Sequence, residues 1–262
     1  MSAADHSFVV LAYRDSPFLA GCLRSLGAQT RPGAVLVSTS TPCAHIETAA
    51  RDAGVPVVVN PDRQGIAGDW NFALRAAATR YVTLAHQDDV YAPAFAARTM
   101  SLFDRHPEGS LCFTGYQQID DEGAPTQSRV SRVKHLIEAV TLGGAEAARG
   151  LRLRMFLSFG NPLPCSSTTF DRNRLGSFRF ASDYASNLDW EAWWRLQRAG
   201  YTFLHAPERL VGRRHNALTE TSRLIADGRR ALEDARMFGQ IWPRPVAGLL
   251  TSLYAASYTG AP

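Results

Sequence analysis

Lysine is the residue type that this sequence of 262 residues most nearly lacks. Lys134 is the one lysine among the 28 lysine and arginine residues. A Schiff base, a phosphate-loop lysine and a lysine general base all need this side chain, so each has a single candidate, in a polar stretch without a motif. Arginine supplies the remaining positive charge. Its guanidinium suits bidentate contacts with phosphate and carboxylate, although most arginines are expected on solvent-exposed faces.

Cysteine pairs and long apolar runs are also missing. The four cysteines are scattered and form no C-x-x-C pair, which indicates free thiols in a reducing compartment. No basic segment followed by an apolar run opens the chain, and the weakly apolar stretch Val246–Gly260 is shorter than the ~18 residues that span a bilayer. We expect a cytoplasmic protein, and peripheral contact with the inner face of an anionic membrane stays open.

Several motifs that identify enzyme classes are absent as well. The sequence contains no G-x-x-x-x-G-K-[ST] loop, no G-x-G-x-x-G fingerprint, no H-E-x-x-H motif and no G-x-S-x-G elbow. The net charge of +4 is spread without clustered basic runs, which argues against a nucleic-acid partner. Nothing in the pattern indicates an oligomeric state.

The first 120 residues alternate short β-branched runs with helical patterns. Such alternation predicts an α/β fold, a parallel sheet with helices on both faces, in which ligands bind outside the carboxyl ends of the strands. The strands expected in this part are Ser7–Tyr13, Val35–Ser38, Val55–Val59, Tyr81–Ala85 and Leu111–Gly115.

After Ile119 the alternation stops, and residues 120–132 are polar and turn-rich. No internal repeat or low-complexity linker is present, so residues 1–262 are expected to form one domain. The second half is expected to pack around the sheet formed mainly by the first half. The elements expected here are helices over Leu142–Phe159, Asn187–Ala199 and Thr219–Gln240, and strands over Ser167–Phe170 and Tyr201–His205.

An imidazole and carboxylates follow the strand Tyr81–Ala85. In an extended backbone residues i and i+2 face the same way, so His86 and Asp88 are expected to converge while Gln87 and Asp89 point elsewhere. Aspartate oxygens suit Mg²⁺ and Mn²⁺, and an imidazole shifts the preference toward Mn²⁺ and later metals. An acidic turn that caps the following helix explains the same residues equally well.

Three further segments have a structural and a functional interpretation. Asp189 and Glu191 lie in the first turn of a helix, where the macrodipole alone favours acids. The segment Arg213–His215 could bind phosphate or metal, although a surface position is the simpler interpretation. The turn Gly65–Asn71 opens a helix whose free amides could receive an anion.

Together, the order and spacing of these segments resemble glycosyltransferase family 2 of the GT-A fold. The resemblance extends from residue 7 to about residue 220. The similar segments are the opening strand and helix Phe8–Arg14 and Cys22–Thr30, the glycine-to-asparagine segment Gly65–Asn71, the D-x-D strand at Tyr81–Asp89, the E-D-W-x-x-W helix at Leu188–Trp193 and the following segment Val211–His215.

Three positions depart from the family's pattern. Residues 38–41, Ser-Thr-Ser-Thr, stand where the family usually has an acidic pair that binds the base and ribose of the donor nucleotide. His86 replaces the first aspartate of D-x-D, which leaves Asp88 as the carboxylate and makes His86 a substitute ligand or a phosphate contact. Leu188 replaces the glutamate of the E-D pair, while Asp189 keeps the position of the base.

The resemblance implies an inverting glycosyltransferase that moves a hexosyl or N-acetylhexosaminyl group from a nucleoside diphosphate sugar, with UDP-sugars favoured, to an acceptor hydroxyl. Saccharides or lipid-linked saccharides are the expected acceptors, in polysaccharide or glycoconjugate biosynthesis. About residues 1–120 would bind the nucleotide sugar, 121–220 would supply the acceptor and catalytic half, and 221–262 would be C-terminal helices. Two other classes stay open: another metal-dependent nucleotide-using α/β enzyme such as a nucleotidyltransferase, and a non-catalytic nucleotide-sugar-binding module.

The resemblance also assigns roles to residues. Asp189 would be the catalytic base, with Glu191 as the alternative, and Mn²⁺ or Mg²⁺ would be held by Asp88 with His86 and His215. The residues expected to contact the nucleotide sugar are Ala12, Tyr13, Arg14, Ser38, Thr39, Gly65, Asn71, Gln87, Asp88, Arg213 and Arg214. Those expected on the acceptor side are Asn161, Ser166, Trp190 and Glu191.

Overall fold

The computed structural model describes residues 5–62, 65–214 and 228–259. The elements up to residue 119 are β1 (His6–Ala12), α1 (Leu19–Gly27), β2 (Ala34–Thr39), α2 (Ala44–Asp52), β3 (Val57–Val59), α3 (Gly65–Ala76), β4 (Tyr81–His86), β5 (Val90–Tyr91), α4 (Phe95–Arg105) and β6 (Gly109–Ile119). The later ones are β7 (Pro125–Thr126), α5 (Arg129–Leu142), β8 (Ala147–Ala148), α6 (Gly150–Ser158), the 3₁₀ turn η1 (Cys165–Ser167), β9 (Thr168–Asp171), α7 (Arg172–Leu175), α8 (Leu188–Arg198), β10 (Thr202–Arg214), α10 (Arg229–Ile241) and α11 (Arg244–Thr259).

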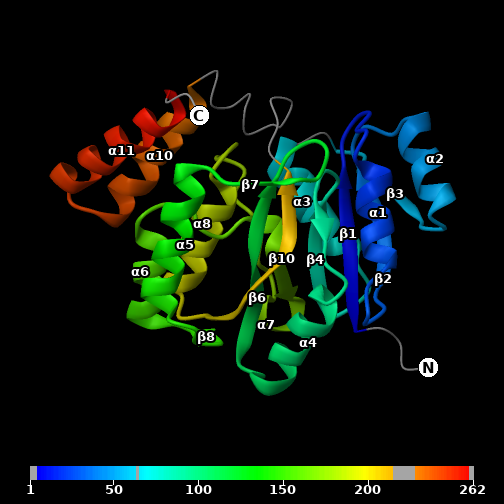
Figure 1. The fold of residues 1–262 in the computed structure, drawn as a ribbon, viewed down its shortest axis with the longest axis horizontal. Helices are drawn as coiled ribbons and strands as arrows, with labels where there is room; N and C mark the ends of the chain where they lie inside the picture. The colour runs from blue at the N-terminus through cyan, green and yellow to red at the C-terminus, as the bar shows by residue number, and fades with distance from the viewer. Residues whose placement is uncertain (1–4, 63–64, 215–227, 260–262) are drawn as a thin grey trace.

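One mixed sheet forms the centre of the molecule (Figure 1). Its strand order is β3-β2-β1-β4-β9-β6-β10-β5, with β7 paired to β6 and β8 paired to β10. The strands β3, β2, β1, β4, β6 and β10 run in one direction, and β9 runs against both of its neighbours. The expected α/β class, with a mostly parallel sheet flanked by helices, is confirmed.

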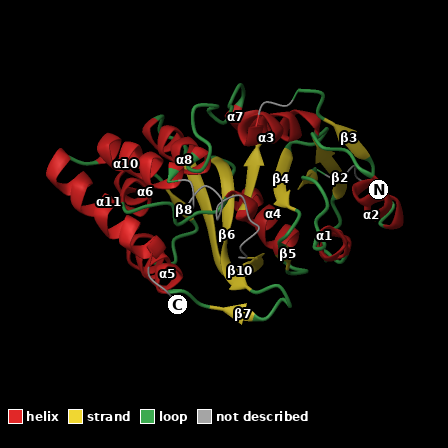
Figure 2. Cartoon of the chain, turned by 90° about the horizontal axis from the view of Figure 1, so that it is seen from above, coloured by secondary structure: helices red, strands yellow, loops and turns green. Residues whose placement is uncertain are grey.

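Helices cover both faces of the sheet, with α3 and α7 on one side and α1 and α4 on the other (Figure 2). Successive residues of β1 therefore enter different cores, because side chains alternate along a strand. Phe8 and Val10 belong to the apolar core that also contains residues of α1 and α2, whereas Val9 belongs to the core that also contains residues of α3, α6 and α8. Burial on both faces explains why the apolar run at the start of the chain is uninterrupted.

The middle of the chain departs from the sequence-based expectation. The prediction of one helix over Leu142–Phe159 is wrong, because α5 already ends at Leu142 and α6 starts only at Gly150. Gly143 and Gly144 take positive φ values of 57° and 78°, a conformation that ends a helix and favours glycine. The turn-rich prediction also missed the start of α5, where the Ser128 side chain caps the helix by accepting a hydrogen bond from a backbone amide.

The strand β10 is much longer than the predicted Tyr201–His205. Register shifts after Ala206 and after Arg209 let it continue beside β6 as far as Arg214. The extension carries two arginines to the carboxyl edge of the sheet, next to the end of β4. The helix predicted from Thr219 begins outside the described residues, and α10 covers its later part. None of the helices that the structure describes combines the length and apolar character needed to cross a bilayer.

Candidate active site

The side chain of Gln87 joins the loops that follow β1 and β4. Its Oε1 accepts a hydrogen bond from the backbone amide of Tyr13 at 3.0 Å, and its Nε2 donates to the carbonyl of the same residue at 3.0 Å. Arg14 has a φ of 55°, which is uncommon for a residue other than glycine, and its amide donates to Thr41 Oγ1 at 2.8 Å. These bonds fix the loop after Ala12 at the carboxyl edge of the sheet.

A carboxylate lies near the end of β2 although β2 itself ends in hydroxyl residues. Ser38 and Thr39 are buried there. Asp69, which comes from α3, accepts hydrogen bonds from Ser40 Oγ at 2.9 Å and from Asn60 Nδ2 at 2.8 Å. The sequence pattern does not single out Asp69, because this acid lies in the neighbouring helix α3 and not directly after β2.

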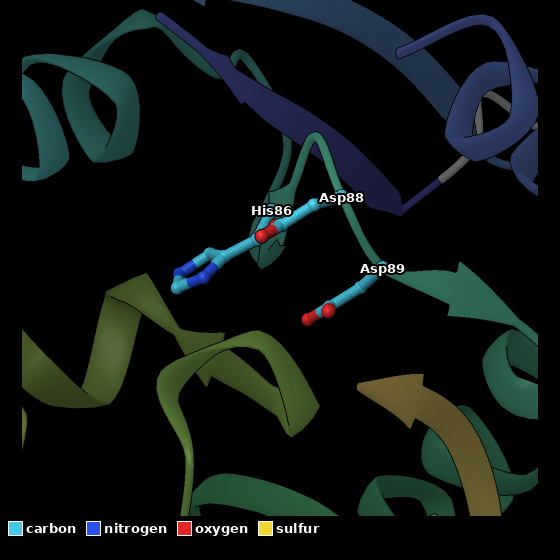
Figure 3. Close-up of side chains that lie close together, drawn as sticks. All are labelled: His86, Asp88 and Asp89. Atoms are coloured by element: carbon cyan, nitrogen blue, oxygen red, sulfur yellow. The ribbon is translucent and has the colours of Figure 1, made fainter. Parts of the chain in front are cut away.

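The loop after β4 is a tight turn that carries three ligand-type side chains. The amide of Asp89 donates to the carbonyl of His86 at 3.1 Å, which closes the turn over Gln87 and Asp88. The backbone is therefore not extended here, and the prediction that Asp89 points elsewhere is wrong. One ligand atom from each of His86, Asp88 and Asp89 lies within 4.8 Å of the others, and the three side chains face the same space (Figure 3).

Two buried polar atoms of this turn, His86 Nε2 and Asp89 Oδ2, make no hydrogen bond of ordinary geometry among the described residues, although the Ser166 hydroxyl lies near enough to Asp89 to lower its pKa. Burial, together with the charge of Arg213, lowers the pKa of His86 to about 4 against the opposing effect of Asp88, so the imidazole is neutral and able to ligate a cation. Burial and the neighbouring Asp88 raise the pKa of Asp89 to about 7. An imidazole nitrogen and two carboxylates fit a divalent cation such as Mn²⁺ or Mg²⁺.

Arg214 holds this turn in place. Its backbone amide donates to Asp89 Oδ1 at 3.0 Å, its Nε donates to the carbonyl of Asp88 at 3.0 Å, and its Nη1 donates to the carbonyl of Asp120. The guanidinium also lies over the ring of Phe18, 4.2 Å from the ring centroid. This buried placement favours positioning of the turn over the predicted direct contact with a diphosphate.

Arg213 lies between two parts of the site. Its charge lowers the pKa of His86 and Asp89 on one side and that of Asp189 on the other. The side chain is half-buried, and its guanidinium has no hydrogen bond or ion pair among the described residues. The neighbouring His215, predicted as a metal ligand, lies outside the described residues.

Asp189 stands in the first turn of α8. Its Oδ1 accepts a hydrogen bond from the amide of Trp190 at 2.8 Å, and the side chain of Asn161 also hydrogen-bonds to it. Burial raises the pKa of Asp189, while Arg230 and these hydrogen bonds oppose the rise. A carboxylate with a raised pKa is a stronger base than an exposed one. The structure thus brings Asn161, predicted on the acceptor side, directly to Asp189.

Three other predicted acceptor residues are placed differently. The ring of Trp190 is fully buried, and its Nε1 donates to a backbone carbonyl of α6 at 2.9 Å. Ser166 is also fully buried. Neither side chain has accessible surface, so direct contact of Trp190 or Ser166 with an acceptor stays a prediction without support from the structure. Glu191 accepts a hydrogen bond from Arg195 one helical turn later at 2.9 Å, which ties its carboxylate to the surface of α8.

The glycine-to-asparagine turn has a largely structural role. The Asn71 side chain exchanges two hydrogen bonds with the backbone of Phe180, donating to its carbonyl at 2.9 Å and accepting from its amide at 2.8 Å. Gly65 begins α3 with a φ of 72°. Trp70 packs against His86 with ring centroids 5.4 Å apart, a contact that helical spacing alone does not indicate. A contact of Asn71 or Gly65 with a nucleotide stays a prediction.

Solved structures share this fold. Crystal structures of S. aureus TarS 1-349, alone and in complex with UDP-GlcNAc, match with TM-scores of 0.59 and 0.63 at 13% and 14% identity, over 88% and 90% of this chain. The chain spans 64% and 71% of those two chains. The mannosyltransferase PcManGT from Pyrobaculum calidifontis, in complex with GDP-Man and Mn²⁺, matches with a TM-score of 0.61 at 18% identity, over 97% of this chain and 69% of that one.

Two comparisons of sequence agree with the fold. The uncharacterized protein MT1568 of Mycobacterium tuberculosis (strain CDC 1551 / Oshkosh) is 26% identical over 243 residues, which cover 88% of this chain and 73% of that protein. The model of the family described as Glycosyl transferase family 2 matches residues 7–158, more than half of the chain. The match includes the loops after β1, β2 and β4 that carry one side of the site. The chain therefore belongs to glycosyl transferase family 2.

Proposed function

We propose that the protein is an inverting glycosyltransferase that moves a hexosyl or N-acetylhexosaminyl group from a nucleoside diphosphate sugar, with a UDP-sugar favoured, to an acceptor hydroxyl. Membership of the family supports sugar transfer from a nucleotide sugar. The observation that carries the proposal is the position of Arg213, whose charge reaches both the His86–Asp89 turn and Asp189. A diphosphate at the turn would thus lie next to an acceptor at Asp189.

The donor side of the proposal rests on the turn after β4. His86, Asp88 and Asp89 would hold a divalent cation, because one ligand atom of each lies close to the others, and because His86 Nε2 and Asp89 Oδ2 are buried without a hydrogen bond among the described residues. A cation bound there supplies positive charge that offsets the charge developing on the leaving diphosphate. Arg213 would contact the phosphates directly, since its guanidinium is otherwise unengaged within the described residues.

The acceptor side of the proposal rests on Asp189. Asp189 would take the proton of the acceptor hydroxyl as the oxygen forms a bond to the anomeric carbon. The bond from that carbon to the diphosphate breaks, and the nucleoside diphosphate leaves with the electron pair. Asn161 and the amide of Trp190 orient the carboxylate for this step. A positioned base of this kind contributes about 10²- to 10⁴-fold to a rate.

Saccharides or lipid-linked saccharides, in polysaccharide or glycoconjugate biosynthesis, are the acceptors that we propose. Exposed apolar side chains on α5 and α11 support contact with the cytoplasmic face of a membrane, where such lipids would be met. They include Leu136 and Val140 on α5, with 63% and 73% of their surface exposed, and Leu249 and Leu253 on α11, with 61% and 59%.

A ligand panel tests the donor. Thermal unfolding would be measured with UDP-, GDP-, dTDP- and CMP-sugars, each with and without Mn²⁺, and the product of any reaction would then be identified. We expect a cation-dependent rise in Tm with UDP-sugars, because a ligand that binds only the folded state stabilises it. Release of inorganic diphosphate would indicate a nucleotidyltransferase instead. Binding without transfer or donor hydrolysis would indicate a non-catalytic module.

A further inference from the structure

The segment that leads into α8 is held by α10, a helix near the C-terminal end of the chain. The two helices lie side by side (Figures 1 and 2). The carboxylate of Glu233, on α10, accepts hydrogen bonds from three successive backbone amides. Its Oε1 accepts from Ala185 at 2.7 Å, and its Oε2 accepts from Ser186 at 2.9 Å and from Asn187 at 2.7 Å. These bonds, which we call the Glu233 clamp, end at the residue that precedes α8.

The Glu233 clamp meets a need that the start of α8 creates. Backbone amides at the beginning of a helix have no acceptor within the helix, so they need a partner from elsewhere. The side chain of Asn187 makes no capping hydrogen bond, and its Nδ2 donates instead to Asp234 on α10 at 2.7 Å. Hydrogen bonds from amides to a carboxylate are stronger than those between neutral groups. The start of α8 is thus fixed by α10.

The residue at the end of the clamp carries the first turn of α8, and this turn contains the proposed base. The amide of Glu191 donates to the carbonyl of Asn187 at 2.9 Å, which closes the turn around Asp189. Asp189 Oδ1 in turn accepts from the amide of Trp190 at 2.8 Å, and the Trp190 ring packs against Phe238 of α10 with centroids 5.1 Å apart. A shift of Asn187 would therefore move the carboxylate of Asp189.

A second contact of α10 with the same loop provides a comparison. Arg236 Nη1 donates to the carbonyl of Asp183 at 3.2 Å, and Arg236 Nη2 donates to the Asp183 carboxylate at 2.5 Å. Both side chains are exposed, with 48% and 57% of their surface accessible. Asp183 lies further from the base along the chain than the three amides of the clamp do. Arg236 thus attaches the loop to α10 without holding the start of α8.

We propose that Glu233 is a positioning residue for the transfer reaction. By holding the amides of residues 185–187, it sets the place of Asp189 relative to the acceptor hydroxyl and to the turn after β4. This inference rests on the proposed function, because it takes Asp189 as the base. A misplacement of about 1 Å can cost about 10²-fold in rate. The helices α8 and α10 both lie outside residues 7–158, so the match to the family model assigns Glu233 no role.

Steady-state kinetics of the full chain test the proposal. Glu233→Ala removes the acceptor of all three amides. We expect kcat to fall about tenfold or more while KM for the donor stays within about twofold, because the turn after β4 is unchanged. Arg236→Ala is the matched control and should keep the natural kcat. An unchanged kcat in Glu233→Ala would overturn the proposal, and so would an equal loss of kcat in Arg236→Ala.

Glu233→Gln covers the case in which Glu233→Ala does not fold. Its side chain has the same shape, and its one oxygen can still accept from these amides, but its amino group cannot accept from the third. We expect a kcat between those of the natural chain and Glu233→Ala, about threefold or more below the natural value. A kcat equal to that of the natural chain would contradict the proposal.

A double-mutant cycle separates positioning of the base from a general loss of structure. In Asp189→Asn the base is already lost, so the addition of Glu233→Gln should lower the residual transfer rate by less than about twofold. Two losses that multiply in full would show that Glu233 acts by another route, and would overturn the proposal.

Failure of the proposed function gives a different result. The proposed function fails if the natural chain transfers no sugar or if Asp189→Asn retains normal transfer, and either result also overturns the positioning role. The positioning role alone fails if Asp189→Asn is slow and the Glu233 variants are not.

Discussion

The backbone amide of Arg214 donates a hydrogen bond of 3.0 Å to the carboxylate of Asp89, and this contact joins the end of β10 to the turn after β4. The two residues are 125 positions apart in the chain. The same arginine binds the carbonyls of Asp88 and Asp120, so one buried side chain fixes the shape of the candidate metal turn. Arg214 should therefore link the stability of the fold to the proposed binding of a cation.

Arg214→Gln should destabilise the fold and weaken cation binding together. The substitution removes a cation and leaves two backbone carbonyls without their donor, and hydrogen bonds to charged groups contribute about 1.5–3 kcal/mol each. We expect the free energy of unfolding, measured by urea denaturation, to fall by about 2 kcal/mol or more. Arg132→Gln is the control for loss of an exposed arginine. A stability equal to that of the control would contradict the assigned positioning role.

Asp89→Asn should weaken cation binding at the turn without unfolding it. The amide oxygen of asparagine can still accept the hydrogen bond from the Arg214 amide, so the fold should be kept. The lost negative charge should weaken Mn²⁺-dependent UDP binding by about tenfold or more, as measured by calorimetry. Asp52→Asn, an exposed acid at the end of α2, is the matched control. Full retention of the Mn²⁺ effect would exclude Asp89 as a ligand.

Asp189→Asn should leave nucleotide binding intact and slow transfer. The amide cannot take a proton from the acceptor hydroxyl, and loss of a positioned base costs about 10²- to 10⁴-fold in rate. The comparison is Glu191→Gln, whose carboxylate is bound to Arg195 and should matter little for kcat. Donor consumption and product formation would be measured with saturating donor. Near-normal transfer by Asp189→Asn, or a greater loss in Glu191→Gln, would show that the base is assigned wrongly.

Lys134→Met should stabilise the ligand-free protein most near neutral pH. Burial and the charge of Arg230 lower the pKa of Lys134 from 10.5 to about 7. Between these values the unfolded chain binds more protons than the folded one, so rising pH stabilises the natural chain relative to the variant. The Tm advantage of Lys134→Met should therefore be largest at pH 7 and below and shrink toward pH 10. An advantage that is constant over this range would contradict the burial of a destabilised ammonium.

The first half of the fold was predictable because its signals are local. Apolar runs such as that around Val9 are buried on both sides of the sheet, and prolines or glycines lie near several helix ends, so the strands β1, β2, β3, β4 and β6 were all found. The second half was predicted less well. The helix α5 exposes Val133, Leu136 and Val140, so its apolar residues do not form one stripe facing the core.

The site was predicted in part, for a similar reason. His86 and Asp88 stood out because they directly follow a buried strand. Asp89 was not predicted as a ligand, because the backbone forms a tight turn there and is not extended. Asp69 was not predicted because it reaches the end of β2 from the neighbouring helix α3. Trp190 was assigned to the acceptor because of its place in a motif, but the motif also carries core residues.

The sequence by itself determined the family and the α/β class, because the order and spacing of motifs along the chain can be recognised without knowledge of any contact. It also predicts that ligands bind at the carboxyl edge of the sheet. Only the tertiary structure decided which charges meet. Lys134, Asp189 and Arg213 come from three distant segments, and their electrostatic interaction depends on distances that folding alone sets. Lys134, the one lysine of the sequence, is likewise placed by folding where the charge of Asp189 acts on it, which its position in the sequence does not indicate.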